Sequence, residues 1–266
     1  MLSLIDTHAH LTDDKYRGSL DDVIKDAQKE GVEDIFTVAY NKQTITQCVD
    51  LCDKYENVYA IIGVHPDDIS DYTPETERLI ECYANHKKVL AIGEIGLDYH
   101  NITDPDVELV KKHQKNVFIA QLILANKLGL PVEIHTRDAI TDTIDVLEKN
   151  KDLLKNGGVV HCFSEGVEEF KKIKDCGLII SVGGVLTFKN GKKLQEVVKY
   201  ADLNDIIIET DCPYLTPEPY RGKQINQPKF VKLVAEKIAE LKGVSLEDVV
   251  IANDCNVRRI FKKFEG

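Results

Sequence analysis

The sequence lacks the paired cysteines of a disulfide framework or of a cysteine-based zinc site. Its seven cysteines are odd in number and scattered, and no two of them form a CxxC pair. Free thiols are typical of a reducing compartment, so we expect a cytoplasmic protein, with access to the nucleus if its source is eukaryotic.

Long apolar runs are also missing. No uninterrupted apolar stretch approaches the roughly 18 residues of a membrane span. The opening residues, MLSLIDTHAH, have neither the basic start nor the long apolar segment of a secretory signal. We therefore expect no membrane association, and no feature of the sequence implies an obligate protein partner.

Basic residues are in the minority. The chain has 34 Lys and Arg against 45 Asp and Glu, a formal net charge of -11. Proteins that grip nucleic acid over their whole surface usually show a basic face, so this class is disfavoured. A phosphate-cleaving site is not excluded, because two divalent cations would add about four positive charges to one cleft.

A glycine-rich phosphate-binding loop is absent as well. An open nucleotide-binding sheet requires such a turn after its first strand, where this chain reads His-Ala-His. The stretch SVGGV at 181–185 has neither the GxGxxG nor the GxxxxGK[ST] spacing. An open doubly wound sheet is therefore the less favoured architecture.

What the sequence does contain is eight short β-branched runs that alternate with amphipathic, charged stretches. The predicted strands are 4–7, 34–39, 58–64, 89–93, 132–134, 158–160, 178–182 and 206–209. The predicted helices include 19–30, 44–55, 74–86 and 107–128, with C-terminal helices at 229–241, 246–252 and 257–263 on the outside. A closed barrel commonly takes about 250 residues. We predict an α/β fold, a single (β/α)8 TIM-like barrel domain over residues 1–266 with additional C-terminal helices.

Histidines and lone carboxylates fall where these strands end. The carboxyl ends of barrel strands share one rim, so residues distant in sequence converge there. The residues concerned are His8, His10, Glu94, His135, His161 and Asp211. Four imidazoles and two carboxylates on one rim predict a metal site.

The types of residue suit this chemistry. His8 and His10, two apart on an extended segment, point to the same side and reach one ion, with Asp6 and Thr7 expected to orient their rings. Imidazoles suit Zn or Mn, and a carboxylate such as Glu94 can bridge two ions. We predict two divalent ions (Zn, Mg or Mn) that activate water, with Glu94 and Asp211 as catalytic residues. Asp211 would accept the water's proton.

Amidohydrolase barrels often bridge their metals with a carbamylated lysine on the fourth strand. This chain has Glu94 there, and AIGEIGLDYH contains no lysine. Dihydroorotase-like and phosphotriesterase-like chemistry is accordingly disfavoured.

Seven motifs spread over the chain resemble those of the TatD family of metal-dependent deoxyribonucleases. In order they are IDTHAHL, IIGVHP, AIGEIGLDY, LPVEIHTRDA, VVHCFS, GGVLTFKN and ETDCPYLTP. The resemblance implies a TIM-like barrel, a divalent-metal cluster and cleavage of DNA, often as a 3'-to-5' exonuclease. By matching position, it assigns His8, His10, Glu94 and Asp211 to one metal, and Glu94, His135 and His161 to the second.

The resemblance also points to substrate contacts. It suggests that His65 of GVHP faces a substrate phosphate, while Arg137 and Arg221 would offer paired contacts to phosphate oxygens. Tyr99 would stack on a base or cap the barrel. Relatives usually read HCFSG where this chain reads HCFSEG, so the carboxylate of Glu165 is expected to repel a phosphate backbone.

Three hypotheses for function remain. The leading one is a deoxyribonuclease that acts on single-stranded DNA or DNA ends. The second keeps the metals and changes the bond, as in an ester or amide hydrolase such as a D-aminoacyl-tRNA deacylase. The third is a barrel that has lost catalysis and only binds; the presence of all six candidate ligands disfavours it.

Overall fold

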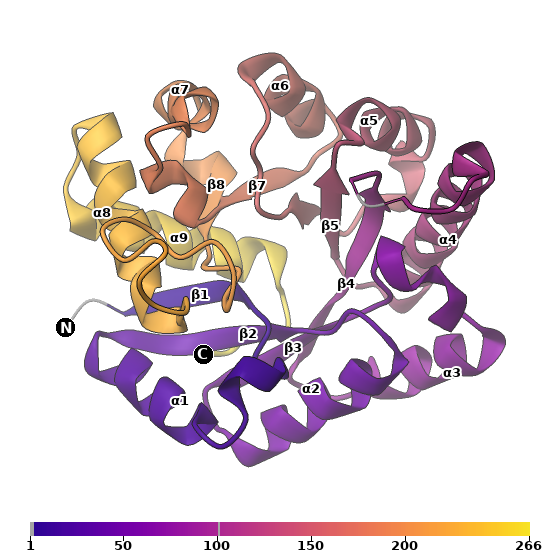
Figure 1. Cartoon of the computed structure of the whole chain (residues 1–266), viewed down its shortest axis with the longest axis horizontal. Helices are drawn as coiled ribbons and strands as arrows, with labels where there is room; N and C mark the ends of the chain where they lie inside the picture. Colours follow the sequence, from indigo (N-terminus) through magenta and orange to yellow (C-terminus); the bar gives the residue numbers. More distant parts are fainter. Residues whose placement is uncertain (1–2, 101) are drawn as a thin grey trace.

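Eight parallel strands form one sheet in the order β1 to β8 in the computed structural model, which describes residues 3–100 and 102–266 (Figure 1). The strands are β1 (Leu4–Ala9), β2 (Val32–Val38), β3 (Val58–Ile62), β4 (Val89–Asp98), β5 (Val132–Arg137), β6 (Gly158–Val160), β7 (Ile179–Val182) and β8 (Ile206–Ile208). The predicted α/β class and TIM-like (β/α)8 fold are confirmed.

The barrel is nearly closed by single contacts between β1 and the end of β8. The Thr7 hydroxyl donates to the carbonyl oxygen of Ile208 at 2.9 Å. Beyond β8, the backbone N–H of Asp211 donates to the His8 carbonyl at 3.0 Å, and that of His10 donates to the Cys212 carbonyl at 2.8 Å. This seam ties the segment that carries Asp211 directly to the first two histidines.

A helix follows each strand, and these helices surround the sheet (Figure 1). They are α1 (Leu20–Lys29), α2 (Lys42–Lys54), α3 (Pro74–Tyr83), α4 (Val107–Leu128), α5 (Ile140–Lys149), α6 (Val167–Asp175), α7 (Lys192–Tyr200) and α8 (Val231–Lys242). Apolar residues at helical spacing, such as Phe118, Leu122 and Ala125 of α4, are buried against the strands. Over the residues described, none of the helices combines the length and apolar character needed to cross a bilayer.

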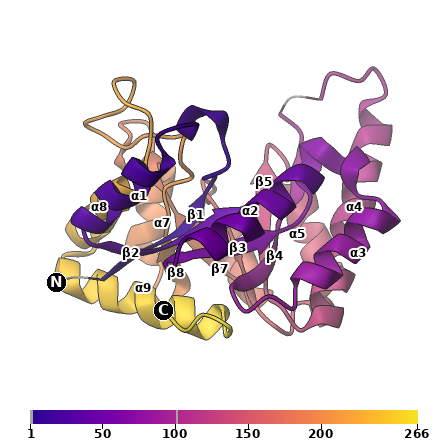
Figure 2. The same cartoon turned by 90° about the horizontal axis from the view of Figure 1, so that it is seen from below.

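The last helix, α9 (Leu246–Ile260), crosses the end of the barrel opposite the long connecting loops (Figure 2). The additional C-terminal helices are present as predicted, but the two predicted at 246–252 and 257–263 form this one continuous helix. The polar run NDCN lies between the two predicted helices. Its residues Asn253 and Asn256 are buried: Asn253 Oδ1 accepts from Ile208 N (3.0 Å), and Asn256 Nδ2 donates to Ile206 O (2.9 Å). The helix therefore continues, and its end packs with inward-facing apolar residues of the strands.

The strands that carry the candidate site run further than predicted. β4 continues to Asp98 instead of ending at 93, so Glu94 lies within the strand. This continuation requires Gly96, whose φ is +146° and where a Cβ atom would collide with the carbonyl oxygen of His135 in β5. β1 and β5 likewise extend through His8 and His135.

Candidate metal centre

A cavity of about 690 Å³ opens at the carboxyl ends of the strands. Five of the six residues predicted as metal ligands line it, namely His10, Glu94, His135, His161 and Asp211. His8, the sixth, is fully buried beneath the cavity, with its Nε2 atom 3.2 Å from that of His10. The structure thus brings all six residues together, as strand-end geometry predicts.

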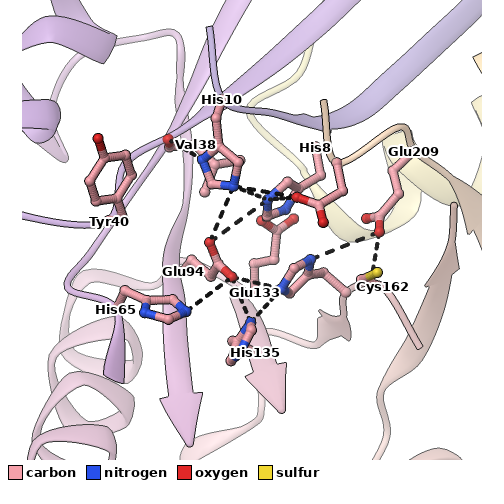
Figure 3. A network of polar contacts seen from close by, with 12 residues as sticks. His8, His10, Val38, Tyr40, His65, Glu94, Glu133, His135, Cys162 and Glu209 are labelled. Carbon is pink, nitrogen blue, oxygen red and sulfur yellow. Dashed lines mark hydrogen bonds and ion pairs between the residues drawn. The ribbon is translucent and has the colours of Figure 1, made fainter. Parts of the chain in front are cut away.

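Glu94 lies at the centre of this group, with one carboxylate oxygen facing each pair of histidines (Figure 3). Its Oε1 atom is 2.7 Å from His135 Nδ1 and 2.8 Å from His161 Nε2. Its Oε2 atom is 3.8 Å from His8 Nε2 and 3.7 Å from His10 Nε2. This placement is typical of a carboxylate that bridges two cations.

The first donor group has the spacing of a site for one ion. Asp211 Oδ1 lies 3.7 Å from His8 Nε2 and 3.4 Å from His10 Nε2. Donors held about 2.1 Å from a tetrahedral ion lie about 3.4 Å from each other. These three residues, together with Glu94 Oε2, therefore fit a divalent cation.

The second donor group is tighter. His135 Nδ1 lies 3.0 Å from His161 Nε2, and both nitrogens face Glu94 Oε1. His65 lies beside this group, with its Nε2 atom 3.7 Å from the same oxygen. Its Nδ1 atom accepts the backbone N–H of Asp67 at 3.1 Å, so Nε2 carries the proton of the neutral ring and is not free to bind a metal. Two imidazole nitrogens around one carboxylate oxygen form a donor set of the type that binds Zn or Mn.

Three of the histidines have a second partner on the far side of the ring. The pairs are His8 Nδ1 with Glu133 Oε1 (2.8 Å), His135 Nε2 with Asp98 Oδ2 (3.0 Å), and His10 Nδ1 with the Val38 carbonyl (3.3 Å). Metal-binding histidines usually donate their other N–H to such a carboxylate or carbonyl, which fixes the orientation of the ring. The remaining nitrogen of each ring is thereby left facing Glu94.

Two of the six residues, Glu94 and His8, have the protonation state that a metal site needs. Burial raises the pKa of Glu94, but the surrounding imidazoles, His161 foremost, outweigh burial and hold that pKa well below its ordinary value. Burial, reinforced by the charge of His161, holds the pKa of His8 well below its ordinary value. An ionised Glu94 and a neutral His8 are both competent metal ligands. Burial lowers the pKa of His161, but the charge of Glu94 outweighs burial and holds that pKa well above its ordinary value, so a cation bound there would displace a proton.

Three residues that line the cavity have left-handed backbone conformations, namely Asp211, Cys162 and Leu215. φ is 54° at Asp211 and 46° at Cys162, which follows His161 directly. The Cys162 N–H donates to Glu209 Oε1 at 2.7 Å, and the Asp211 N–H binds β1 as described above. Such conformations persist where surrounding contacts hold them, and they cluster at functional sites.

A family model described as TatD related DNase matches residues 5–262. The chain belongs to the TatD family of metal-dependent hydrolases. The family resemblance of the seven motifs is therefore confirmed.

Among TatD relatives, the uncharacterized metal-dependent hydrolase YabD of Bacillus subtilis is 43% identical over 97% of this chain and 99% of its own. The 3'-5' ssDNA/RNA exonuclease TatD of Salmonella typhimurium is 31% identical over 97% of this chain and 99% of its own. The crystal structure of YJJV, a TatD homologue of Escherichia coli, superposes with a TM-score of 0.89 at 26% identity, covering 98% of this chain and 99% of the other.

The four residues that the TatD resemblance suggests as substrate contacts do not all lie in the same cavity. His65 and Arg137 line the metal cavity. Tyr99 is not among the residues lining that cavity, and its hydroxyl donates to Asp142 at 2.8 Å. Arg221 lines a neighbouring cavity. Their roles toward substrate stay predictions.

The expected repulsion by Glu165 is compensated in this TatD structure. Its Oε2 atom lies 2.6 Å from Nζ of Lys193, so the carboxylate is paired. Glu165 is also absent from the lining of the metal cavity, although its neighbour Ser164 is present.

Sequence reasoning missed the buried acids that contact the TatD histidines. Glu133 lies two residues before His135 on β5, so both face the barrel interior. An acid within an otherwise apolar strand, as in LPVEIH, was the available signal.

The expectation that Asp6 orients the histidine rings is wrong. The Asp6 carboxylate instead accepts hydrogen bonds from Thr210, from its backbone N–H at 2.8 Å and from its hydroxyl at 2.6 Å. Thr7 likewise binds β8 instead.

Proposed function

We propose that the chain is a nuclease that hydrolyses phosphodiester bonds in single-stranded DNA from the 3' end, using two divalent ions. The observation that carries this proposal is the position of Glu94, whose two carboxylate oxygens each face a different donor group. A lone metal site would not need a carboxylate shared in this way.

The two donor groups would hold one ion each. His8, His10 and Asp211 would share the first with Glu94 Oε2, and His135 and His161 would share the second with Glu94 Oε1. The imidazole-rich donors favour Zn or Mn over Mg. When bound, the ions supply Lewis-acid activation of water and of the phosphoryl oxygen.

The chain's own side chains would do the rest. Asp211, whose side chain is 14% exposed against 4% for Glu94, is the acid better placed to accept the proton of an attacking water. Arg137, at the end of β5, would bind a phosphate oxygen of the substrate. Glu133 and Asp98 would keep His8 and His135 oriented during turnover.

The choice of substrate is supported by the relatives and by the cavity. The Salmonella typhimurium relative is named a 3'-5' ssDNA/RNA exonuclease, so RNA belongs beside DNA in any assay. The cavity of about 690 Å³ lies in the range of small-molecule sites and is roomy enough for a terminal nucleotide.

The proposal is tested by loading metal-free protein with Mg2+, Mn2+ or Zn2+ and supplying single-stranded DNA labelled at either end, RNA, and D-aminoacyl-tRNA. We expect mononucleotides released from the 3' end, with loss of activity on chelation and in Glu94→Ala. Glu168→Ala, which removes an exposed acid on α6, is the matched control. Deacylation of the tRNA without cleavage of DNA would establish the ester hydrolase instead. Absence of hydrolysis with every metal would refute both.

A further inference from the structure

A second cavity of about 410 Å³ opens beside the metal centre. Leu215, in the loop after β8, lines both cavities. The walls of the second cavity also carry Lys15 from the loop after β1, Phe188 from the segment after β7, and Arg221. Three loops of the catalytic rim thus build a compartment next to the candidate metals.

The charge of this cavity is opposite to that of the whole chain. The chain carries a formal charge of -11, yet none of the described residues that line the cavity is Asp or Glu. Lys15 and Arg221 are exposed and take part in no ion pair within the described structure; their charged groups lie over aromatic rings. Asp13, two residues before Lys15, accepts the Tyr214 hydroxyl at 2.8 Å. Cations left without acidic partners attract a phosphate group.

Aromatic rings lie next to both cations. The Arg221 guanidinium lies 3.7 Å from the centre of the Phe188 ring, and Lys15 Nζ lies 4.2 Å from the centre of the Tyr214 ring. Tyr214 is 47% exposed and lines the metal cavity, while Ile225 is 49% exposed and lines the second one. A guanidinium supported on one face by an aromatic ring offers its other face for stacking by a base.

We propose that this second cavity binds the nucleotide adjacent to the terminal one in a single-stranded nucleic acid, its base against Arg221 and Ile225 and its phosphate against Lys15. Cations interleaved with flat side chains are the pattern by which proteins hold single strands. Leu215 borders both cavities, so a strand that passes over this residue would reach from one to the other. The inference rests on the proposed function for its substrate class.

The test measures binding separately from cleavage. Metal-loaded protein is titrated with fluorescein-labelled phosphorothioate strands of one to four nucleotides, which resist hydrolysis. We expect affinity to rise by about tenfold when a base is added beyond the first, a rise that Arg221→Ala abolishes. Arg221→Lys keeps the charge, so it should lose this rise but retain the salt dependence. Lys15→Ala should lower the slope of log affinity against log salt by about 0.7.

The matched control is Lys223→Ala in the same loop, because Lys223 is exposed, binds the Pro219 carbonyl and does not line the cavity. The inference is overturned if Arg221→Ala binds all lengths as wild type does, or if abasic strands show the same rise. If the protein cleaves unmodified DNA but its affinity does not rise with strand length, the proposed subsite is refuted and the nuclease proposal stands. If affinity rises with strand length but no DNA is cleaved, the nuclease proposal is refuted and the subsite stands.

Discussion

Glu133 Oε1 lies 2.8 Å from Nδ1 of His8, although 125 positions separate the two residues in the chain. Both side chains are fully buried, and Glu133 Oε2 has no hydrogen-bond partner among the residues that the structure describes. The carboxyl group thus orients the imidazole and leaves the Nε2 atom of His8 facing Glu94.

Glu133→Gln is expected to weaken metal binding by about 10- to 100-fold while the fold is retained, because the substituted amide is similar in size but a poorer partner for the ring. Metal content and chelator competition measure the effect. Glu236→Gln, an exposed acid on α8, should leave metal binding unchanged. Equal metal affinity in the two variants would show that Glu133 serves packing only.

Removal of metal should destabilise the protein, because a ligand that binds only the folded state stabilises it. At a free metal concentration about 100 times the dissociation constant, the expected loss on chelation is about 2.7 kcal/mol. Thermal unfolding with and without chelator measures this loss. In Glu94→Ala, which removes the acid shared by both donor groups, chelation should change the unfolding temperature little. A full chelator effect in that variant would contradict the bridging role.

The strand count and the convergence of the six residues could be predicted because both depend on local patterns. β-branched runs mark the strands, and the barrel topology carries their carboxyl ends to one rim. His8 and His161 could therefore be placed together although they lie in different strand-end segments.

The partners of those residues could not be predicted, because they depend on the stagger between strands. The contact of Glu133 with His8 joins β5 to β1 across the barrel interior, which no local pattern encodes. The extension of β4 past Glu94 depends on the conformation of Gly96. The second cavity exists only where three loops meet.

The continuity of α9 makes Asn253 a stabilising residue. Its side chain is 3% exposed, and its Oδ1 atom accepts the backbone N–H of Ile208 at 3.0 Å. Asn253→Ala leaves this buried N–H without a partner, so we expect a loss of about 1–3 kcal/mol in the free energy of unfolding. Urea denaturation measures the loss, and Ile251→Ala, at a position 56% exposed on the same helix, is the control. A similar small change in both variants would mean that Asn253 is not a structural tie.

Asp34 should make stability depend on pH at the end of the barrel away from the metal centre. Burial, reinforced by the charge of Glu33, raises the pKa of Asp34 in the folded protein to about 6, from 3.8. As the pH rises, the Asp34 carboxyl therefore ionises in the unfolded chain before it ionises in the folded protein. The free energy of unfolding is highest below about pH 4 and falls as the pH rises from about 4 to 6. Asp34→Asn should be more stable than wild type by about 1–2 kcal/mol at pH 8, allowing for solvent screening, and no more stable at pH 3.5. Urea unfolding at both pH values decides this, with the exposed Asp50→Asn on α2 as the control. A gain that is the same at both pH values would show that the effect comes from packing, and not from ionisation of Asp34.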